Sequence, residues 1–234
     1  MDARSNYSLI IIGSGPGIGR HIARHFAENK FSKVALLARN PRKLADDQAA
    51  VEAVAPGQLT VKTYQVDISD EGQLLATLGR VENDIGLPEC VLFNAAVISP
   101  TRLFEIEEAD MIHDFKVTCT ALYSAARWAM PLLLRLAKTG GDHVRPSLLV
   151  TSSLLPQDPI PELFLLSMVK AAQKNMVLSL SKTYAPQGVH VGLITIGGAV
   201  DESNKTLNPA NIALEAWEFY GRSREQQGVE VQIL

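Results

Sequence analysis

The chain has 234 residues, 47% hydrophobic and 20% charged, a composition typical of one globular domain with a sizeable core. Its net charge of −3 does not favour binding to nucleic acid or to an anionic membrane surface. Apolar runs are far shorter than the roughly 20 residues of a membrane helix. The polar residues 1–7 lead directly into an apolar run, which leaves no room for a signal peptide. We therefore predict a single cytoplasmic domain over residues 1–234.

Cysteine and histidine positions bear on compartment and metal binding. Cys90 and Cys119 lie in apolar surroundings and are interpreted as buried, reduced thiols, with a disulfide between them as the alternative. The histidines lack the spacing to carboxylates or cysteines that a metal site needs, so we predict no metal. They are His21, His25, His113, His143 and His190.

The most informative stretch is an apolar run, residues 8–12, that ends in the sequence Gly-Ser-Gly-Pro-Gly-Ile-Gly. A helical pattern follows at once, so the stretch predicts a buried strand, a tight turn and a helix N-terminus. Gly13 would allow the sharp turn, Gly17 the approach of a ligand, and Gly19 close packing of helix on strand. Backbone N–H groups and the helix dipole would then favour a phosphate above the turn. The alternative is a glycine-rich turn without a ligand.

Strand-like and helix-like segments alternate along the rest of the chain. Further strands are predicted at 33–38, 59–66, 89–93, 147–150, 189–194 and 229–233. Helices are predicted from Asn40 as N-cap through Val51, and at 70–83, 109–137, 162–184 and 208–220. This alternation predicts an α/β fold with a single Rossmann-like, doubly wound parallel sheet of about seven strands and helices on both faces.

The end of the second predicted strand bears on the choice of dinucleotide. An acidic residue there binds the 2′-hydroxyl of NAD, whereas an arginine accommodates the 2′-phosphate of NADP. The chain has Arg39 followed by Asn40, with Arg42 and Lys43 nearby, which favours NADP(H). The alternative is that Arg39 is only a solvated residue. Asp67 ends the third strand. Its side chain would lie beside the adenine ring or would serve as the N-cap of the next helix.

Five segments, in this order and spacing, resemble the short-chain dehydrogenase/reductase family over nearly the whole chain. Residues 13–19 resemble its Thr-Gly-x-x-x-Gly-x-Gly turn, with Ile12 in place of Thr. Residues 93–96, Phe-Asn-Ala-Ala, resemble its Asn-Asn-Ala-Gly stretch, with Ala in place of Gly. The other segments are Val66-Asp67-Ile68, Thr151-Ser152-Ser153 and Lys170.

The resemblance implies a set of cofactor contacts along the chain. Ile196-Gly197 stands where the family has Pro-Gly, and glycine there still allows backbone contact with the nicotinamide amide. The implied cofactor-binding residues are Gly13, Ser14, Gly17, Ile18, Gly19, Arg39, Asn40, Asp67, Ile68, Asn94, Ala95, Ala96, Lys170 and Gly197.

The family's chemistry uses four side chains, of which the resemblance assigns two to this chain. Ser153 corresponds to the Ser that binds the substrate carbonyl, and Lys170 to the Lys that holds the nicotinamide ribose. The acid/base Tyr, four residues before the Lys and thirteen after the Ser, corresponds to Leu166. The Asn that steadies a proton-relay water corresponds to Lys116. The catalytic residues implied for this chain are therefore Ser153, Lys170 and Lys116.

The missing Tyr matters because a leucine cannot transfer a proton. General acid catalysis is typically worth about 10²- to 10⁴-fold, so ordinary ketone reduction should be severely weakened. Lys116 is a possible replacement acid, because a desolvated lysine near another cation has a lowered pKa. The alternative is that Lys116 faces solvent or pairs with Asp114. Tyr123 is a weaker candidate acid whose alternative role is helix packing.

Two other features concern the substrate side. Only ten residues separate Gly197 from Asn208, so the lid that the family often has would be short and the site open to water. Asp158 follows the Ser153 strand and would pair with a cationic substrate, or would be a surface turn residue beside proline.

These expectations support two functions of different class. The first is an NADP(H)-dependent oxidoreductase with an atypical active site, which transfers a hydride to an unidentified small organic substrate such as an iminium ion. The alternative is a cofactor-binding pseudoenzyme, a non-redox catalyst or a regulatory protein on the same fold. By resemblance, the helices at 109–137 and 162–184 would pair copies into a homodimer or homotetramer.

Overall fold

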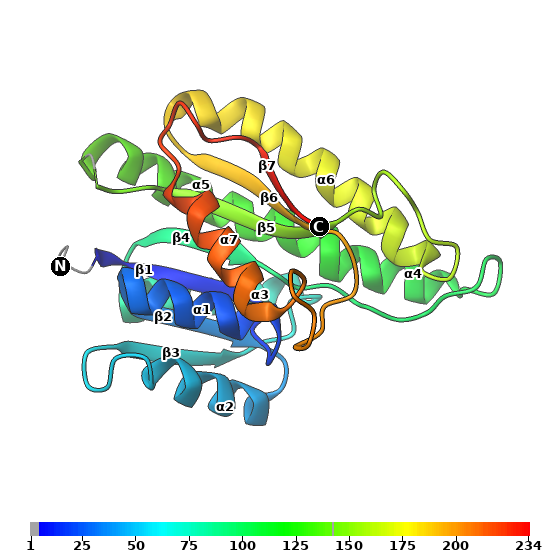
Figure 1. Ribbon diagram of the computed structural model, residues 1–234, viewed down its shortest axis with the longest axis horizontal. Coiled ribbons are helices and arrows are strands. Elements are labelled where there is room, and N and C mark those ends of the chain that lie inside the picture. Colours follow the sequence, from blue (N-terminus) through cyan, green and yellow to red (C-terminus); the bar gives the residue numbers. More distant parts are fainter. Residues whose placement is uncertain (1–4, 142) are drawn as a thin grey trace.

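A seven-stranded parallel sheet organises the computed structural model, which describes residues 5–141 and 143–234 (Figure 1). The strand order is β3-β2-β1-β4-β5-β6-β7. The strands are β1 (Ser5–Ile12), β2 (Phe31–Ala38), β3 (Thr60–Gln65), β4 (Pro88–Phe93), β5 (Ser147–Ser153), β6 (His190–Ile196) and β7 (Glu230–Ile233). The order reverses between β1 and β4, and doubly wound sheets bind ligands at such a reversal.

Helices cover both faces of the sheet, with α1, α2 and α7 on one face and α3, α5 and α6 on the other (Figure 1). The α-helices are α1 (Ile18–Asn29), α2 (Pro41–Glu52), α3 (Glu71–Ile85), α4 (Glu108–Phe115), α5 (Ala121–Thr139), α6 (Phe164–Tyr184) and α7 (Pro209–Gly221). The π-helical turn η1 (Lys116–Thr120) joins α4 to α5, and the 3₁₀ turn η2 (Ala185–Gln187) follows α6.

Alternation along β1 shows how one apolar run builds two cores. Leu9 and Ile11 pack with α1, α2 and α7, whereas Ile10 and Ile12 pack with α3, α5 and α6. All four side chains are fully buried, because a strand at the centre of a parallel sheet is covered on both faces. The predicted α/β class and doubly wound sheet are therefore confirmed.

Several element boundaries agree with the sequence for identifiable reasons. The side chain of Asn40 accepts hydrogen bonds from the N–H groups of Arg42 and Lys43, so Asn40 caps α2 as predicted. Asp70 and Asn208 cap α3 and α7 in the same way. The N-cap of α3 is therefore Asp70 and not Asp67, whose side chain instead accepts from the Ser69 N–H at 3.0 Å. Strand β5 extends beyond the predicted residues 147–150 to Ser153, where it pairs with Ile196 of β6.

The long helix predicted at 109–137 was wrong in one respect. The structure divides this stretch into α4, η1 and α5, and at the π-helical turn the Ala121 N–H bonds the Lys116 carbonyl, five residues back. This one-turn widening changes which side chains face the sheet on either side of it.

The amino-terminal ends of the strands are closed by a buried carboxylate. Glu89 of β4 is fully buried and accepts hydrogen bonds from Ser5 at 2.7 Å and Tyr220 at 2.7 Å. It also pairs with Lys30 at 2.5 Å and with the Arg145 N–H at 2.8 Å. These four donors link Glu89 to β1, to α7 and to the segments that precede β2 and β5.

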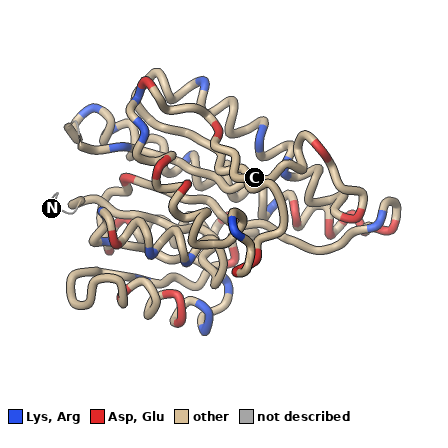
Figure 2. The backbone as a smooth tube through the Cα atoms, in the orientation of Figure 1, with Lys and Arg blue, Asp and Glu red and all other residues tan. Residues whose placement is uncertain are grey.

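Charged residues of both signs are interspersed over the helices and loops (Figure 2). Cys90 and Cys119 are free and buried. In the ranges 5–141 and 143–234, none of the helices has the length and apolarity to cross a membrane. Within the same residues, no cluster of three His, Cys, Asp or Glu side chains is placed to hold a metal.

His190, at the start of β6, makes the free energy of unfolding depend on pH. It is 2% exposed, its Nε2–H donates to the Gly228 carbonyl at 3.2 Å, and its ring packs edge-on against Phe219 at 4.6 Å. Burial lowers the pKa of His190 from 6.5 to about 4. The folded chain therefore resists a proton that the unfolded chain accepts.

We predict that the protein loses stability in mild acid because of His190. As the pH falls from 6.5 toward 4, the unfolded state binds the proton first, and the free energy of unfolding drops by up to about 3 kcal/mol. Urea unfolding at a series of pH values measures this slope, and His190→Gln should flatten it. Equal slopes for the two proteins would contradict the assignment.

Candidate functional site

The turn after β1 approaches the end of β4 closely. Gly13 has a φ of +96°, and a Cβ there would lie 2.6 Å from the Ala95 nitrogen, so only glycine fits. A Cβ on Gly19 would lie 2.8 Å from the Gly13 carbonyl oxygen, so α1 also depends on a missing side chain. Both positions have the roles expected from the sequence.

The N-terminus of α1 is open above this turn. Gly17 is its N-cap residue and provides no side-chain cap, in contrast to the capped helices α2 and α3. A Cβ on Gly15 or on Gly17 would meet no atom within 4 Å. Because the N–H groups of a first helical turn have no partner within the helix, those of Ile18 and Gly19 are available to an anion. The cradle therefore fits a dinucleotide diphosphate.

A buried carboxylate on α2 holds the turn in place. Asp47 is fully buried and accepts hydrogen bonds from Ser14 Oγ and Arg20 Nε, each at 2.6 Å. Ser14 and Arg20 flank the segment that contains Gly15, Gly17 and Gly19, so Asp47 holds both ends of this segment. Sequence reasoning missed Asp47, since the only signal was one acidic residue at a core position of α2.

The adenosine side of the site is formed at the ends of β2 and β3. Arg39 is exposed at the end of β2, and Asp67, partly buried, follows β3. Hydrogen bonds from the side chain and the N–H of Ser69 lower the pKa of Asp67, and Arg39 and His113 add to the effect. The Asn40 amide oxygen caps α2. Ile68 is buried beside Asp67.

The Asn94 side chain connects the ends of three strands by hydrogen bonds. Its Nδ2 donates to the Gly13 carbonyl at 2.9 Å, and its Oδ1 accepts the Thr151 hydroxyl at 2.9 Å. The ends of β1, β4 and β5 are thus linked through one amide. Ala95 and Ala96 continue from it along the same edge of the sheet.

Ser153 is the last residue of β5, and Lys170 lies on α6, the helix that follows β5. Ser153 is partly buried, and its Oγ accepts the Leu155 N–H at 3.3 Å. The Lys170 Nζ donates to the Thr151 carbonyl at 2.8 Å and to Gln173 Oε1 at 2.9 Å. Desolvation lowers the pKa of Lys170 from 10.5 to about 8.

Leu166 lies one turn before Lys170 on α6. It is 6% exposed and belongs to a small apolar cluster with Leu155, Leu165, Val169 and Cys119. The Leu166 side chain therefore lies among apolar side chains, one turn before Lys170.

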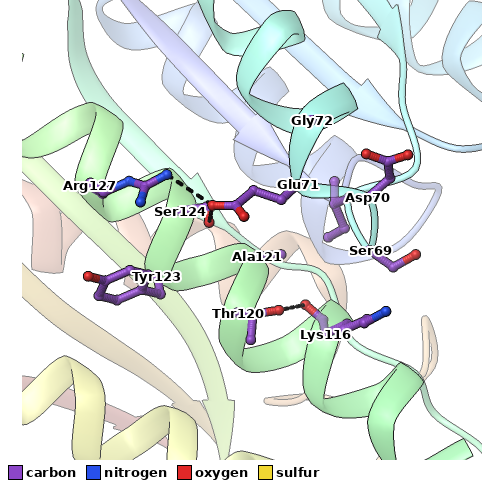
Figure 3. Close-up of a pocket in the computed structure, with 11 residues that line it drawn as sticks. Ser69, Asp70, Glu71, Gly72, Lys116, Thr120, Ala121, Tyr123, Ser124 and Arg127 are labelled. Carbon is purple, nitrogen blue, oxygen red and sulfur yellow. Dashed lines mark hydrogen bonds and ion pairs between the residues drawn. The ribbon is translucent and has the colours of Figure 1, made fainter. Parts of the chain in front are cut away.

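Lys116 is placed elsewhere, in a hollow of about 920 Å³ between the start of α3 and α5 (Figure 3). Its exposed side chain lines this hollow together with Ser69 and Tyr123, and Ser153 and Lys170 are not in the lining. Arg127, also in the lining, pairs with Glu71 at 2.9 Å. Of the two alternatives for Lys116, the structure therefore has the exposed one.

Thr118 takes the inward position on the same turn. It is fully buried, and its carbonyl accepts the amide of Gln173, the residue that binds Lys170. Residues two apart on a helix do not share a face, so Thr118 and Lys116 point to different sides.

Two further expected positions have structural surroundings of their own. The N–H of Gly197 donates to the Ile233 carbonyl at 2.8 Å, and a Cβ on Gly197 would lie 2.8 Å from the Leu234 side chain. Asp158 is exposed in the turn after β5. Gly197 therefore has a packing reason to be glycine, in addition to any contact with a ligand.

The expected cofactor residues lie along one edge because all the strands are parallel. The carboxyl ends of β1 to β6 bring Gly13, Arg39, Asp67, Asn94, Ser153 and Gly197 to this edge. A sequence profile of the short chain dehydrogenase family matches residues 8–211. The chain belongs to this family.

The relatives of this short chain dehydrogenase include oxidoreductases. Glucose 1-dehydrogenase 2 of Bacillus subtilis (strain 168) is 26% identical over 201 residues, which cover 84% of this chain and 73% of that protein. Several other curated relatives are matched over 41–43% of their length. The chain is an oxidoreductase-type member of the family.

Solved structures agree on the fold. The NADPH-bound short chain oxidoreductase of Pseudomonas aeruginosa PAO1, described as containing an atypical catalytic centre, superposes with a TM-score of 0.84 at 21% identity, covering 98% of this chain and 96% of that one. The NADH-dependent reductase A1-R′, complexed with NAD, gives a TM-score of 0.82 at 15% identity, covering 97% and 94%.

We predict that Asp47→Ala loosens the glycine turn. Removing the carboxylate leaves Arg20, whose side chain is 23% exposed, and Ser14 without their acceptor, and should lower the free energy of unfolding by about 2 kcal/mol. Amide hydrogen exchange should accelerate over residues 13–19. Urea unfolding and exchange measurements check this, with the exposed neighbour Asp46→Ala as a control that stays within about 0.5 kcal/mol. Equal behaviour of the two variants would contradict the role of Asp47.

Proposed function

We propose that this short chain dehydrogenase is an NADP(H)-dependent oxidoreductase with an atypical active site, which transfers a hydride to a small organic substrate. One observation carries the proposal. The open glycine turn, Arg39 and Ser153 follow or end separate strands and lie at the same edge of the sheet, where the Lys170 ammonium donates to the Thr151 carbonyl.

Several groups of this chain are suited to hold the dinucleotide. The uncapped N-terminus of α1 and the Gly13–Gly19 backbone suit the diphosphate, and Asp67 with Ile68 suits the adenine. Lys170 has three N–H donors, of which two are used, so one is left for a ribose hydroxyl. Ser14, Asn40, Asn94, Ala95, Ala96 and Gly197 complete the proposed contacts.

Arg39 supports NADP(H) over NAD(H). It stands at the end of β2, where a carboxylate would select a ribose hydroxyl, and its side chain is exposed to a ligand. A guanidinium binds phosphate through two parallel hydrogen bonds and keeps its charge at all working pH values.

The side chains around the reacting position favour a substrate that needs no proton. When bound, NADPH supplies a hydride. Ser153 can donate a hydrogen bond to a carbonyl oxygen, but Leu166, which we propose replaces the family's Tyr, offers no proton to a developing alkoxide. Hydride addition to the C=N⁺ bond of an iminium ion gives a neutral amine directly. An iminium substrate therefore fits the site best.

The Pseudomonas aeruginosa protein is NADPH-bound and has an atypical catalytic centre, which supports our proposal that this chain also binds NADPH at an atypical centre.

We also propose a cytoplasmic homodimer or homotetramer. It would form through α5 and α6, which expose Tyr123 (56%) and Met168 (37%).

A second candidate function is a cofactor-binding protein without redox turnover. The apolar cluster around Leu166 favours it, because a leucine cannot transfer a proton. The two functions differ in whether a substrate reacts, while both require the dinucleotide.

We predict that the protein binds NADPH in the micromolar range and NADH more weakly, and that Arg39→Ala removes this preference. Loss of the guanidinium should raise the Kd for NADPH about tenfold or more, or about 1.4 kcal/mol, and leave NADH unchanged. Nicotinamide fluorescence titrations measure both constants. Arg135→Ala, which removes the same charge from an exposed position of α5, is the control. Binding of neither nucleotide by the wild type would refute the proposal.

We predict that Leu166→Tyr gains NADPH-dependent reduction of simple ketones. A hydroxyl placed four residues before Lys170 would restore a proton donor, worth about 10²- to 10⁴-fold. NADPH oxidation followed at 340 nm (the nicotinamide absorbance) reports the gain. Adding Lys170→Met should abolish it. A variant that binds NADPH but stays inert would favour the second candidate function.

A further inference from the structure

The side chain of Gln173, also on α6, contacts Lys170 and has not yet been given a role in the site. Gln173 is fully buried, one helical turn after Lys170. Its Oε1 accepts from the Lys170 Nζ at 2.9 Å, and its Nε2 donates to the Thr118 carbonyl at 3.1 Å. Gln173 therefore connects the buried ammonium to the π-helical turn η1.

The chemistry of the two neighbours fixes the orientation of this amide. An ammonium group only donates and a carbonyl only accepts, so Oε1 must face Lys170 and Nε2 must face Thr118. No other orientation satisfies both groups. A side chain with only one kind of atom at this position would leave one neighbour unpaired in the interior.

The Lys170 ammonium needs such support. A lysine side chain is flexible, and its charge is strongly hydrated in water, so a buried ammonium without acceptors is costly. Here the Thr151 carbonyl and Gln173 Oε1 accept two of its three N–H groups, and the third has no partner among the described residues. The two acceptors thus hold Nζ at one place and leave one donor for a ligand.

The π-helical turn supplies the far end of this connection. Thr118 lies in the middle of η1, on the buried side, whereas Lys116 of the same turn is exposed. π-Helical turns within α-helices are frequent at functional sites. In this chain the turn offers a fixed backbone oxygen to Gln173, independent of any side chain on α4 or α5.

We propose that Gln173 is a positioning residue that holds the Lys170 ammonium in place for the dinucleotide and is itself held by the Thr118 carbonyl. The inference rests on the proposed function, because it assigns the free Lys170 donor to the bound cofactor. Gln173 does not touch substrate or cofactor and acts only through Lys170.

Two substitutions at Gln173 separate this role from simple packing. Gln173→Leu removes an acceptor that stabilises the charged ammonium, so the pKa of Lys170 should fall by about one pH unit. Gln173→Glu places a carboxylate beside the ammonium, so the pKa should rise by a similar amount. A packing defect has no reason to move the pKa in opposite directions. Ser167→Ala, which removes a buried hydroxyl on the same helix, is the matched control and should leave the pKa unchanged.

The direct measurement is a pH titration of the Lys170 Nζ by NMR of ¹⁵N-lysine-labelled, ligand-free protein, with the signal assigned by its loss in Lys170→Met. The wild-type midpoint should lie near pH 8. Shifts of opposite sign in the two Gln173 variants support the proposal. An unchanged midpoint in a folded Gln173→Leu protein overturns it. If that variant does not fold, an unchanged midpoint in Gln173→Glu overturns it equally.

A second measurement uses cofactor binding. Gln173→Leu should raise the Kd for NADPH about tenfold or more, in line with one hydrogen bond to a charged group. The same substitution should add no further loss in the Lys170→Met background, because the effect passes through Lys170. A wild-type Kd in Gln173→Leu, or equal losses in both backgrounds, overturns the positioning role. Failure of the wild type to bind NADPH or NADH would instead refute the proposed function, and the NMR titration would still report on Gln173.

Discussion

The close approach of the β1 turn to the end of β4 is the constraint on which the site depends. Gly13 can lie against Ala95 only because it has no side chain, and Asn94 then bonds the Gly13 carbonyl and the Thr151 hydroxyl together. This contact sets the spacing of β1, β4 and β5 at the sheet edge where the strand order reverses. The uncapped N-terminus of α1 lies next to this contact. Its free N–H groups are therefore placed where a phosphate would bind.

Buried polar side chains stabilise the site from behind. Asp47 holds the glycine turn, Asn94 joins three strand ends, and Gln173 supports Lys170, and each has a different set of hydrogen-bond partners. Such groups are costly in an apolar interior unless they are paired, so their geometry is narrowly defined. The site is thereby held rigid at its base, while Arg39 and the short segment between Gly197 and Asn208 remain exposed toward the ligand side.

The proton donor is where the proposed mechanism departs from the family's usual chemistry. The polar partners of Lys170 are Thr151 and Gln173, and the position one turn earlier is the apolar Leu166. A dinucleotide site with no hydroxyl one turn before Lys170 is chemically consistent with the proposed cationic acceptor. It is equally the arrangement that would remain if redox turnover had been lost, which is why the behaviour of Leu166→Tyr decides between the two functions.

The fold and the course of the cofactor edge were predictable from local sequence, because strand–helix alternation dictates a parallel sheet and the carboxyl ends of parallel strands share one edge. The roles of Gly13 and Gly19 were predictable from their spacing, and the role of Asn40 as a helix cap was predictable from its place before Pro41. Tertiary structure alone decided which residues of the helix around 116–120 face inward, since a π-helical turn shifts the helical phase and leaves no clear sequence signature. It also decided the partners of Asp47 and Gln173. Each is one buried polar residue whose meaning depends on a group distant in the sequence, and periodicity within its own helix contains no information about that group.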